Sequence, residues 1–228
     1  FDIFSTGRDY TEATPWHYRF FAPHDVNGLI QLFGGREQFI KALDDLFTLE
    51  SDELTLDVSD VSGLKGQYAH GNEPSHNFAY LYSYAGRPWK TQELTRELLD
   101  EMYDDTPDGI IGNEDCGQMS AWYVMSSLGF YSVCPGTGEY VLTTPLFDEA
   151  EMIMANGKVL TIKANNPARN RYIKSVSLNG RPLTTTFITY AQLLEGGVLE
   201  YELSREPVKN IDLGRPYSLS TGEEASVP

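Results

Sequence analysis

Residues 126–144 read SSLGFYSVCPGTGEYVLTT, and the character of the chain changes within this stretch. Before Pro135, apolar residues recur at the three- and four-residue spacing of one helical face. After Gly136, the apolar runs are short, β-branched and partly alternating, which is typical of strands. The sequence therefore predicts an α+β chain, with a helical part over residues 1–137 and a β-rich unit over residues 138–228.

Four helices are predicted in the helical part, and long, polar, glycine-rich loops join them. Such loops favour a helical array whose loops build a site at one end. The helix that follows Pro88 is expected to use Thr91 as its N-cap. The acidic stretch 50–66 has no period and predicts a loop. The expected helices cover residues 36–49, 76–85, 88 onward, and 117–128.

The β-rich unit is predicted to form one antiparallel sheet. Asn-Gly and Gly-Gly pairs separate its strands, and these pairs are typical of tight turns. A short helix is expected at residues 190–194, and the polar tail from Arg215 is expected to fray. The predicted strands cover residues 140–144, 159–164, 173–178 and 198–203.

Composition excludes several classes of function. The chain has 228 residues, with 17 Lys and Arg against 33 Asp and Glu, so its formal charge is −16. Such a surface repels phosphate backbones and anionic membranes, which excludes nucleic acid as a partner. No apolar run approaches the roughly 18 residues of a membrane span. Cys116 and Cys134 are expected to be free thiols on either side of a helix, and Phe1 at the start indicates a piece of a longer protein.

Three polar segments carry the candidate chemistry, at residues 10–18, 70–76 and 112–118. Together they concentrate carboxylates, amides, histidines and tryptophan in loops at helix starts, and a sugar offers hydroxyls to acids and amides and apolar C–H faces to tryptophan. Hydrolysis of a sugar linkage needs one protonated carboxyl group for the departing oxygen and one ionised carboxyl group to activate water or attack carbon. The segments of Glu12 and Asp115 could supply this pair.

Structural roles compete with each of these assignments. Asp115 with Gln118 three residues later matches a capping box, which on the residues alone is the more common role. Glu12 can be an ordinary loop carboxylate, and Asn72 with Glu73 offers oxygen ligands for calcium in a sequence that loops often contain. Trp122 is expected in the core.

The sequence lacks the motifs of several other chemistries. It has no phosphate-binding glycine loop, no His-Glu-x-x-His zinc pattern and no Gly-x-Ser-x-Gly elbow.

Read together, the longer motifs resemble a known family. Residues 71–76 with 80–92, and residues 112–123 with 128–131, are similar to the signatures of glycoside hydrolase family 92, and the resemblance covers about residues 8–205. The family consists of calcium-dependent, exo-acting α-mannosidases that invert configuration, and the resemblance implies α-1,2-linked mannose glycans as substrates. Family members carry a β-sandwich before an (α/α)6 toroid. The chain therefore resembles the C-terminal portion, with a partial toroid, and its partner would be the missing N-terminal part or a partner chain.

The resemblance also implies residue roles and a location outside the cell or in the periplasm. Glu12 would be the general acid and Asp115 the base. Asn72 and Glu73 would bind Ca2+, which would engage the O2 and O3 hydroxyls of mannose. The remaining pocket residues would be Trp16, His76, Trp89 and Glu114.

Two segments depart from the family pattern. Many members have Gly-Asn-Ala before the tryptophan and Gln after it, where this chain has residues 13–15 and His17. A neutral imidazole is a poor calcium ligand. Some members have Asp at the position of Asn113, where it would support the base.

Two other functions remain open as alternatives. One is a catalytically silent carbohydrate-binding or scaffold module, and the other is a toroid glycosidase for another sugar. In each case an exposed apolar seam is expected where the missing part would pack.

Overall fold

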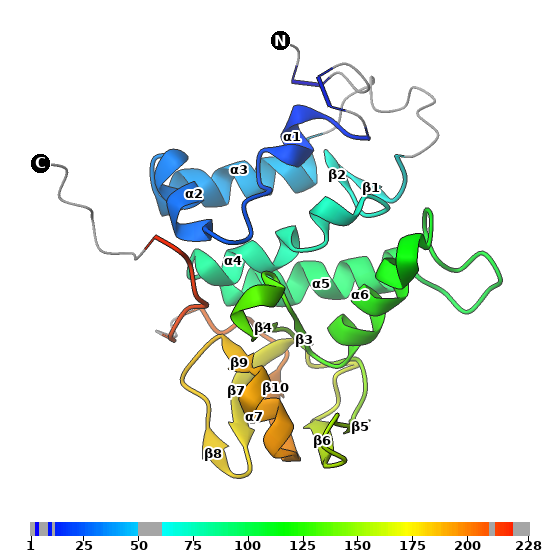
Figure 1. Cartoon of the computed structure of the whole chain (residues 1–228), viewed down its shortest axis with the longest axis vertical. Helices are drawn as coiled ribbons and strands as arrows, with labels where there is room; N and C mark the ends of the chain where they lie inside the picture. The colour runs from blue at the N-terminus through cyan, green and yellow to red at the C-terminus, as the bar shows by residue number, and fades with distance from the viewer. Residues whose placement is uncertain (1–2, 5–8, 11, 50–60, 210–212, 221–228) are drawn as a thin grey trace, which may run out of the picture. The chain divides into compact units, whose positions relative to one another are not determined.

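The computed structural model describes residues 3–4, 9–10, 12–49, 61–209 and 213–220 (Figure 1). The chain divides into two compact units. The first unit comprises residues 1–78, 111–113 and 217–228, and the second comprises residues 79–110 and 114–216. Residues 50–60 of the loop predicted at 50–66, and the last eight residues of the tail, lie outside the described residues.

The first unit is helical around an aromatic core. α1 covers Pro15–Tyr18, α2 covers Val26–Leu32, and α3 covers Arg36–Thr48. α3 confirms the helix predicted at 36–49, and its apolar face is buried. The Phe20 ring lies 5.3 Å from Phe33 and 5.8 Å from Phe78 between centroids. A hairpin of β1 (Leu64–Lys65) and β2 (Tyr68–Ala69) leads into the 3-10 turn η2 (Glu73–Ser75).

A C-terminal segment completes this unit by hydrogen bonding to the start of α2. Asp25, the N-cap of α2, accepts hydrogen bonds from the Gly28 amide, the Ser218 hydroxyl and the Ser220 amide through Oδ1. Its Oδ2 accepts a further bond from the Ser220 hydroxyl. The Leu219 amide donates to the His24 carbonyl. The expectation that the tail frays from Arg215 was therefore wrong for residues 218–220, which these hydrogen bonds hold in place.

Helices of the second unit follow the predicted order with shifted boundaries. The helix expected at 76–85 is shorter and begins as a 3-10 turn, with η3 at Phe78–Tyr80 and α4 at Leu81–Tyr84. α5 covers Pro88–Met102, and α6 covers Gln118–Ser127 after the 3-10 turn η4 at Asp115–Gly117. The prediction that Thr91 is the N-cap of α5 was wrong, because Arg87 occupies that position. Proline suits the first helical position because its φ is fixed and it lacks an N–H group, so α5 begins at Pro88.

The β-rich part holds two sheets, so the prediction of a single antiparallel sheet was wrong. β3 (Phe130–Tyr131), β4 (Glu139–Leu142) and β9 (Phe187–Thr189) form one of them. The other has the order β5-β6-β10-β7-β8, in which β10 pairs parallel with β6 and antiparallel with β7. A parallel pair needs a long connection, which residues 165–196 supply. Its strands are Glu149–Ile153, Val159–Ala164, Gly197–Ser204, Tyr172–Leu178 and Arg181–Pro182.

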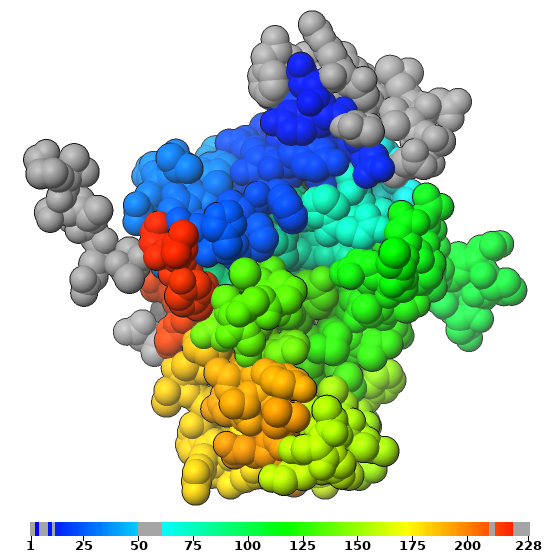
Figure 2. Space-filling model, in the orientation of Figure 1, coloured from blue at the N-terminus to red at the C-terminus, as the bar shows by residue number. Residues whose placement is uncertain are grey.

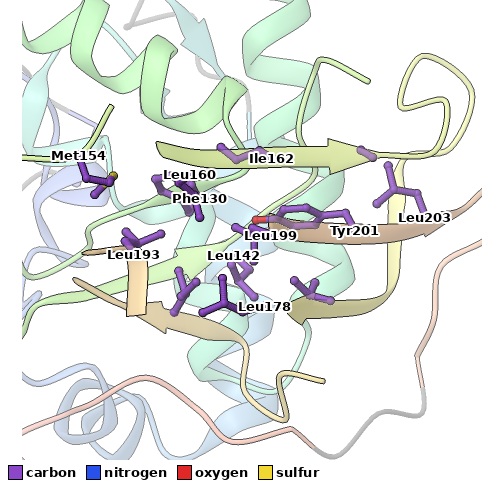
Figure 3. Close-up of a cluster of buried hydrophobic side chains, with 13 residues drawn as sticks. Phe130, Leu142, Met154, Leu160, Ile162, Leu178, Leu193, Leu199, Tyr201 and Leu203 are labelled. Atoms are coloured by element: carbon purple, nitrogen blue, oxygen red, sulfur yellow. The ribbon is translucent and has the colours of Figure 1, made fainter. Parts of the chain in front are cut away.

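The core of this part lies on one face of the five-stranded sheet (Figure 3). Along β10, Leu199, Tyr201 and Leu203 are buried, whereas the glutamates between them are exposed, as the two-residue period of a strand requires. The predicted short helix is α7 (Tyr190–Glu195), and the Asn156 amide donates to the Leu194 carbonyl at 2.7 Å. Figure 2 shows these two distant stretches, in yellow-green and orange, side by side on the surface.

Two smaller predictions can be checked on the described residues. Cys116 is exposed and Cys134 half-buried, and both are free thiols, as expected. Within the described ranges, none of the helices has the length and apolar character needed to cross a bilayer.

Candidate active site

The segment around α1 presents a carboxylate followed by buried aromatic residues. Glu12 is exposed and precedes the helix, which begins at Pro15 for the same reason as α5. Trp16 is half-buried, and the Arg19 guanidinium lies 4.6 Å from the centroid of its ring. His17 is fully buried, with its ring 5.5 Å from that of Phe78.

The segment around η2 places Asn72 and Glu73 beside α1. The Ser75 hydroxyl lies 2.7 Å from the carbonyl oxygens of Ala69 and Asn72, which fixes the turn. The Asn72 amide donates to the Tyr18 hydroxyl at 3.3 Å, and α1 packs against both β2 and η2. The first unit therefore brings together the segments of Glu12, Trp16 and Asn72.

Buried polar atoms in these two segments lack hydrogen-bond partners among the described residues. A buried donor or acceptor without a partner costs about 1–3 kcal/mol, so each such atom requires an explanation. Asn72 Oδ1 and Glu73 Oε1 are the oxygen types that bind divalent cations. The atoms in this group are Trp16 Nε1, His17 Nδ1 and Nε2, Asn72 Oδ1, Glu73 Oε1 and Asn77 Oδ1.

Three buried histidines surround the same segments, and all three are neutral at pH 7. Burial, assisted by the nearby His76, lowers the pKa of His17 to about 3. Burial also lowers the pKa of His76 to about 4, although the hydrogen bond between its Nε2 and the His70 carbonyl acts in the opposite direction. The pKa of His70 lies well below its usual value because of burial, with a further contribution from His76. His76, predicted to line the pocket, is thus committed to His70.

The Asp115 segment belongs to the second unit. The prediction that Asp115 and Gln118 form a capping box at the start of the following helix was wrong. Glu114 serves the start of α6 instead, because its carboxylate accepts hydrogen bonds from the Ser120 amide at 3.1 Å and the Ser120 hydroxyl at 2.6 Å. Cys116 and Gly117 adopt φ values of 54° and 75°, and this left-handed kink displaces the helix start to Gln118. Asp115 is exposed, and its side chain does not cap α6.

The other predicted residues of this unit have mixed positions. Trp89 lies in the first turn of α5, and two cationic groups lie near its ring, with Arg87 Cζ 5.3 Å and Lys209 Nζ 5.9 Å from the ring centroid. Trp122 is fully buried, which confirms its prediction as core. Sequence reasoning missed that His17 is buried and that its ring nitrogens have no hydrogen-bond partner among the described residues. The signal available was a titratable residue inside an otherwise aromatic run.

The described residues do not form a ready-made metal centre. No three His, Cys, Asp or Glu side chains within the described ranges come together in a metal-binding arrangement. A cation bound in the first unit would therefore depend on an amide oxygen as well. Asn72 Oδ1 meets that condition because it is buried and lacks a partner in the described part of the chain.

The described residues thus form an α+β fold in which exposed carboxylates precede α1 and α6, and in which two buried oxygens, Asn72 Oδ1 and Glu73 Oε1, lack partners in the described part of the chain. Carboxyl groups are the acid and base of glycoside hydrolases. Residues 1–205 match the Glycosyl hydrolase family 92 catalytic domain, and the chain belongs to that family.

Solved structures of the family share this fold. A family GH92 α-mannosidase from Bacteroides thetaiotaomicron, solved with mannoimidazole, has 38% identity and a TM-score of 0.89 over 94% of this chain and 29% of its own. A family GH92 inverting mannosidase from the same bacterium has 36% identity and a TM-score of 0.82 over 96% of this chain and 31% of its own.

A further relative from another organism is similar in sequence to this chain. An uncharacterised secreted glycosidase of Arthroderma benhamiae is 32% identical over 206 residues, which is 89% of this chain and 24% of that protein. The chain thus spans about a quarter to a third of the length of these relatives.

Proposed function

We propose that this chain is part of the catalytic domain of an exo-acting α-mannosidase that releases terminal α-1,2-linked mannose from glycans with inversion. The observation that carries the proposal is the likeness in sequence and fold to two family 92 mannosidases, one of which is described as inverting. The exposed Asp115 adds support, because its neighbour Glu114 serves α6 in its place.

The mechanism assigns one role to each carboxyl group. Glu12 is the general acid that protonates the departing glycosidic oxygen, and Asp115 is the base that activates water on the opposite face of the sugar. An inverting enzyme must leave room for that water, so the two carboxyl groups are expected about 6.5–9.5 Å apart. Trp16 and Trp89 contribute apolar surface for the C–H faces of the sugar.

The donor atoms of the first unit fit a divalent cation. We assign Asn72 Oδ1 and Glu73 Oε1 as oxygen ligands of Ca2+, because both atoms are buried and neither has a partner among the described residues. When bound, the ion would orient mannose through its O2 and O3 hydroxyls. The chain's own residues do the remaining work, since Tyr18 holds the Asn72 amide at 3.3 Å and thereby directs its oxygen.

The same proposal extends to architecture and location. Residues 1–137 form the later helices of an (α/α)6 toroid, and residues 138–228 form its β-rich end. The remainder of the toroid comes from an N-terminal part of the same enzyme or from a partner chain. The secreted relative supports action on glycans outside the cell or in the periplasm.

The general acid is tested with Glu12→Gln in the intact protein. The leaving group of mannobiose is the hydroxyl oxygen of the second sugar, which would depart as an alkoxide unless the acid protonates it, so hydrolysis of mannobiose should fall by about 10²–10⁴-fold. Binding of mannobiose, measured by calorimetry, should persist. Glu37→Gln, on α3, serves as the matched control and should retain activity. Turnover of Glu12→Gln equal to that of the unchanged enzyme would remove Glu12 from the acid role.

Metal dependence is tested by chelation. Treatment with chelator should abolish release of mannose from an α-1,2-mannobiose, and added calcium should restore it, because the sugar would otherwise lose its orienting ion.

Inversion of configuration is tested on the product. Proton NMR of the mannose first released should show the β-anomer. Binding of mannobiose without turnover in any condition would instead favour the silent carbohydrate-binding module.

A further inference from the structure

The segment that carries Asp115 is held through its backbone, while the carboxylate itself is exposed. The Gln118 amide donates a hydrogen bond to the Asp115 carbonyl, and the Gly117 amide donates to the Glu114 carbonyl at 3.2 Å. Among the described residues, none donates a hydrogen bond to the Asp115 carboxylate. A carboxylate that acts as a base needs an accessible oxygen held in a fixed direction. The backbone of this segment therefore has to supply that direction.

Glu114 joins the segment to α6 with both of its carboxylate oxygens. Oε1 accepts a hydrogen bond from the Ser120 amide at 3.1 Å, and Oε2 accepts one from the Ser120 hydroxyl at 2.6 Å. Hydrogen bonds to an ionised carboxylate are stronger than those between neutral groups, and the dipole of a helix favours negative charge near its first turn. The start of α6 thus binds the neighbour of Asp115 and leaves Asp115 outside the helix.

The backbone between these two anchors is strained. Cys116 has a φ of 54° and a ψ of 22°, and Gly117 follows with a φ of 75°. A residue other than glycine seldom adopts the left-handed conformation, and such outliers occur preferentially at active sites. The bonds from Ser120 to Glu114 span this kink, so they oppose its relaxation. Without them, the backbone of Asp115 would be free to move.

We propose that Ser120 is a positioning residue for the base, because by binding both carboxylate oxygens of Glu114 it fixes the direction in which Asp115 meets the attacking water. The inference rests on the base role that the proposed function gives to Asp115. It also changes the role of Glu114, which the family resemblance places in the sugar pocket. Ser120 and Glu114 act through Asp115 and contact no sugar.

Steady-state kinetics of the intact protein on α-1,2-mannobiose test the proposal. Ser120→Ala should lower kcat at least about tenfold and change KM less than about twofold, because a displaced base weakens the transition state and leaves substrate binding intact. Ser120 is exposed and alanine is a strong helix former, so the variant is expected to fold. Ser120→Thr keeps both donors and should retain kcat within about threefold.

A matched control removes the same kind of hydrogen bond elsewhere in the second unit. Ser175 is exposed on β7, and its hydroxyl donates to the Glu202 carboxylate at 3.0 Å. Ser175→Ala should therefore have the kcat and KM of the unchanged protein. A loss equal to that of Ser120→Ala would mean that the kinetic effect does not come from the Asp115 segment.

A disabled base separates positioning from a purely structural role. In the Asp115→Asn background, Ser120→Ala should lower the remaining kcat by less than about twofold, because the group that Ser120 orients is already disabled. A structural role would cost the same factor in both backgrounds. The leaving group gives a second readout, since water must be activated whichever group departs. Ser120→Ala should therefore lose the same factor on an aryl mannoside as on mannobiose, whereas Glu12→Gln should lose less on the aryl mannoside.

The outcomes distinguish this inference from the proposed function. An active protein in which Ser120→Ala leaves kcat unchanged, or costs an equal factor with and without Asp115→Asn, would overturn the inference alone. A protein that hydrolyses no mannoside under any condition would contradict the proposed function, and with it any role of Ser120 in positioning a base.

Discussion

Gly129 illustrates how a single residue joins the helical and β-rich parts of the second unit. Its φ is 97°, and an added Cβ would lie 2.8 Å from Pro145 Cγ and 3.0 Å from the Tyr201 hydroxyl. The same hydroxyl donates to the Gly129 carbonyl at 3.0 Å. The position therefore requires glycine both for its backbone conformation and for space.

Gly129→Ala should lower the free energy of unfolding by about 3 kcal/mol, because the left-handed backbone costs about 1–2 kcal/mol and the contact with Pro145 adds to it. Gly157→Ala is the matched control, since Gly157 has a φ of 81° with nothing within 4 Å of the added Cβ. It should cost about 1 kcal/mol. Denaturant unfolding of both variants measures the difference. Equal losses would show that the close approach contributes nothing.

The Asp115 segment shows what the sequence can and cannot reveal at this scale. The pattern of Asp115 and Gln118 has the chemistry of a capping box, and nothing in the letters locates the kink at Cys116. A non-glycine residue with a φ of 54° is a tertiary outcome, and it moves the helix start past the predicted cap. Similarly, that the described residues offer no partner to the nitrogens of His17 depends on what surrounds the ring, which local sequence does not specify.

At the scale of elements, long periodic segments were predictable and short ones were not. α3, β6 and β10 have a sustained helical or alternating pattern, and the structure matches them within about a residue at each end. α1 has four residues and α2 has seven, too few for a period to emerge. β5 was missed because it contains two glutamates and is largely exposed. The parallel pairing of β10 with β6 is set by non-local contacts, which local patterns do not encode.

The connection between α2 and the C-terminal segment gives a prediction on pH. Burial raises the pKa of Asp25, but hydrogen bonds from Ser220, Ser218 and Gly28 outweigh burial and hold the pKa well below its usual value. A carboxyl group with a lowered pKa stabilises the folded state above its unfolded pKa of about 4, and the contribution is lost as pH falls through the lower folded value.

Asp25→Asn should therefore lower the free energy of unfolding by about 1 kcal/mol at pH 7, as loss of an N-cap does. The gap between the variant and the unchanged protein should persist to about pH 4 and shrink at pH 3 and below. Thermal unfolding at each pH measures it. Asp105→Asn, in an exposed turn, serves as the control. A gap that stays constant down to pH 2 would contradict the role given to these hydrogen bonds.

At the scale of the whole molecule, the two carboxyl groups proposed for catalysis belong to different compact units. Glu12 is in the first unit with Asn72 and Glu73, and Asp115 is in the second with Trp89. The Asp115 segment lies in a long motif, whereas the Glu12 segment departs from the family pattern at residues 13–15 and at His17. The proposed function requires the two segments to meet in one site, a condition that local sequence does not specify because about a hundred residues lie between them.

Kinetics of a double variant test whether both groups act in one reaction. Groups that act as a unit give non-additive losses, because removal of either already disables the shared step. Glu12→Gln with Asp115→Asn should therefore lower kcat/KM for mannobiose about as much as the more damaging single change, whereas Glu12→Gln with Asp105→Asn should match Glu12→Gln alone. A double variant whose loss equals the product of the two single losses would mean that the carboxyl groups work independently, and the acid–base pair would have to be reassigned.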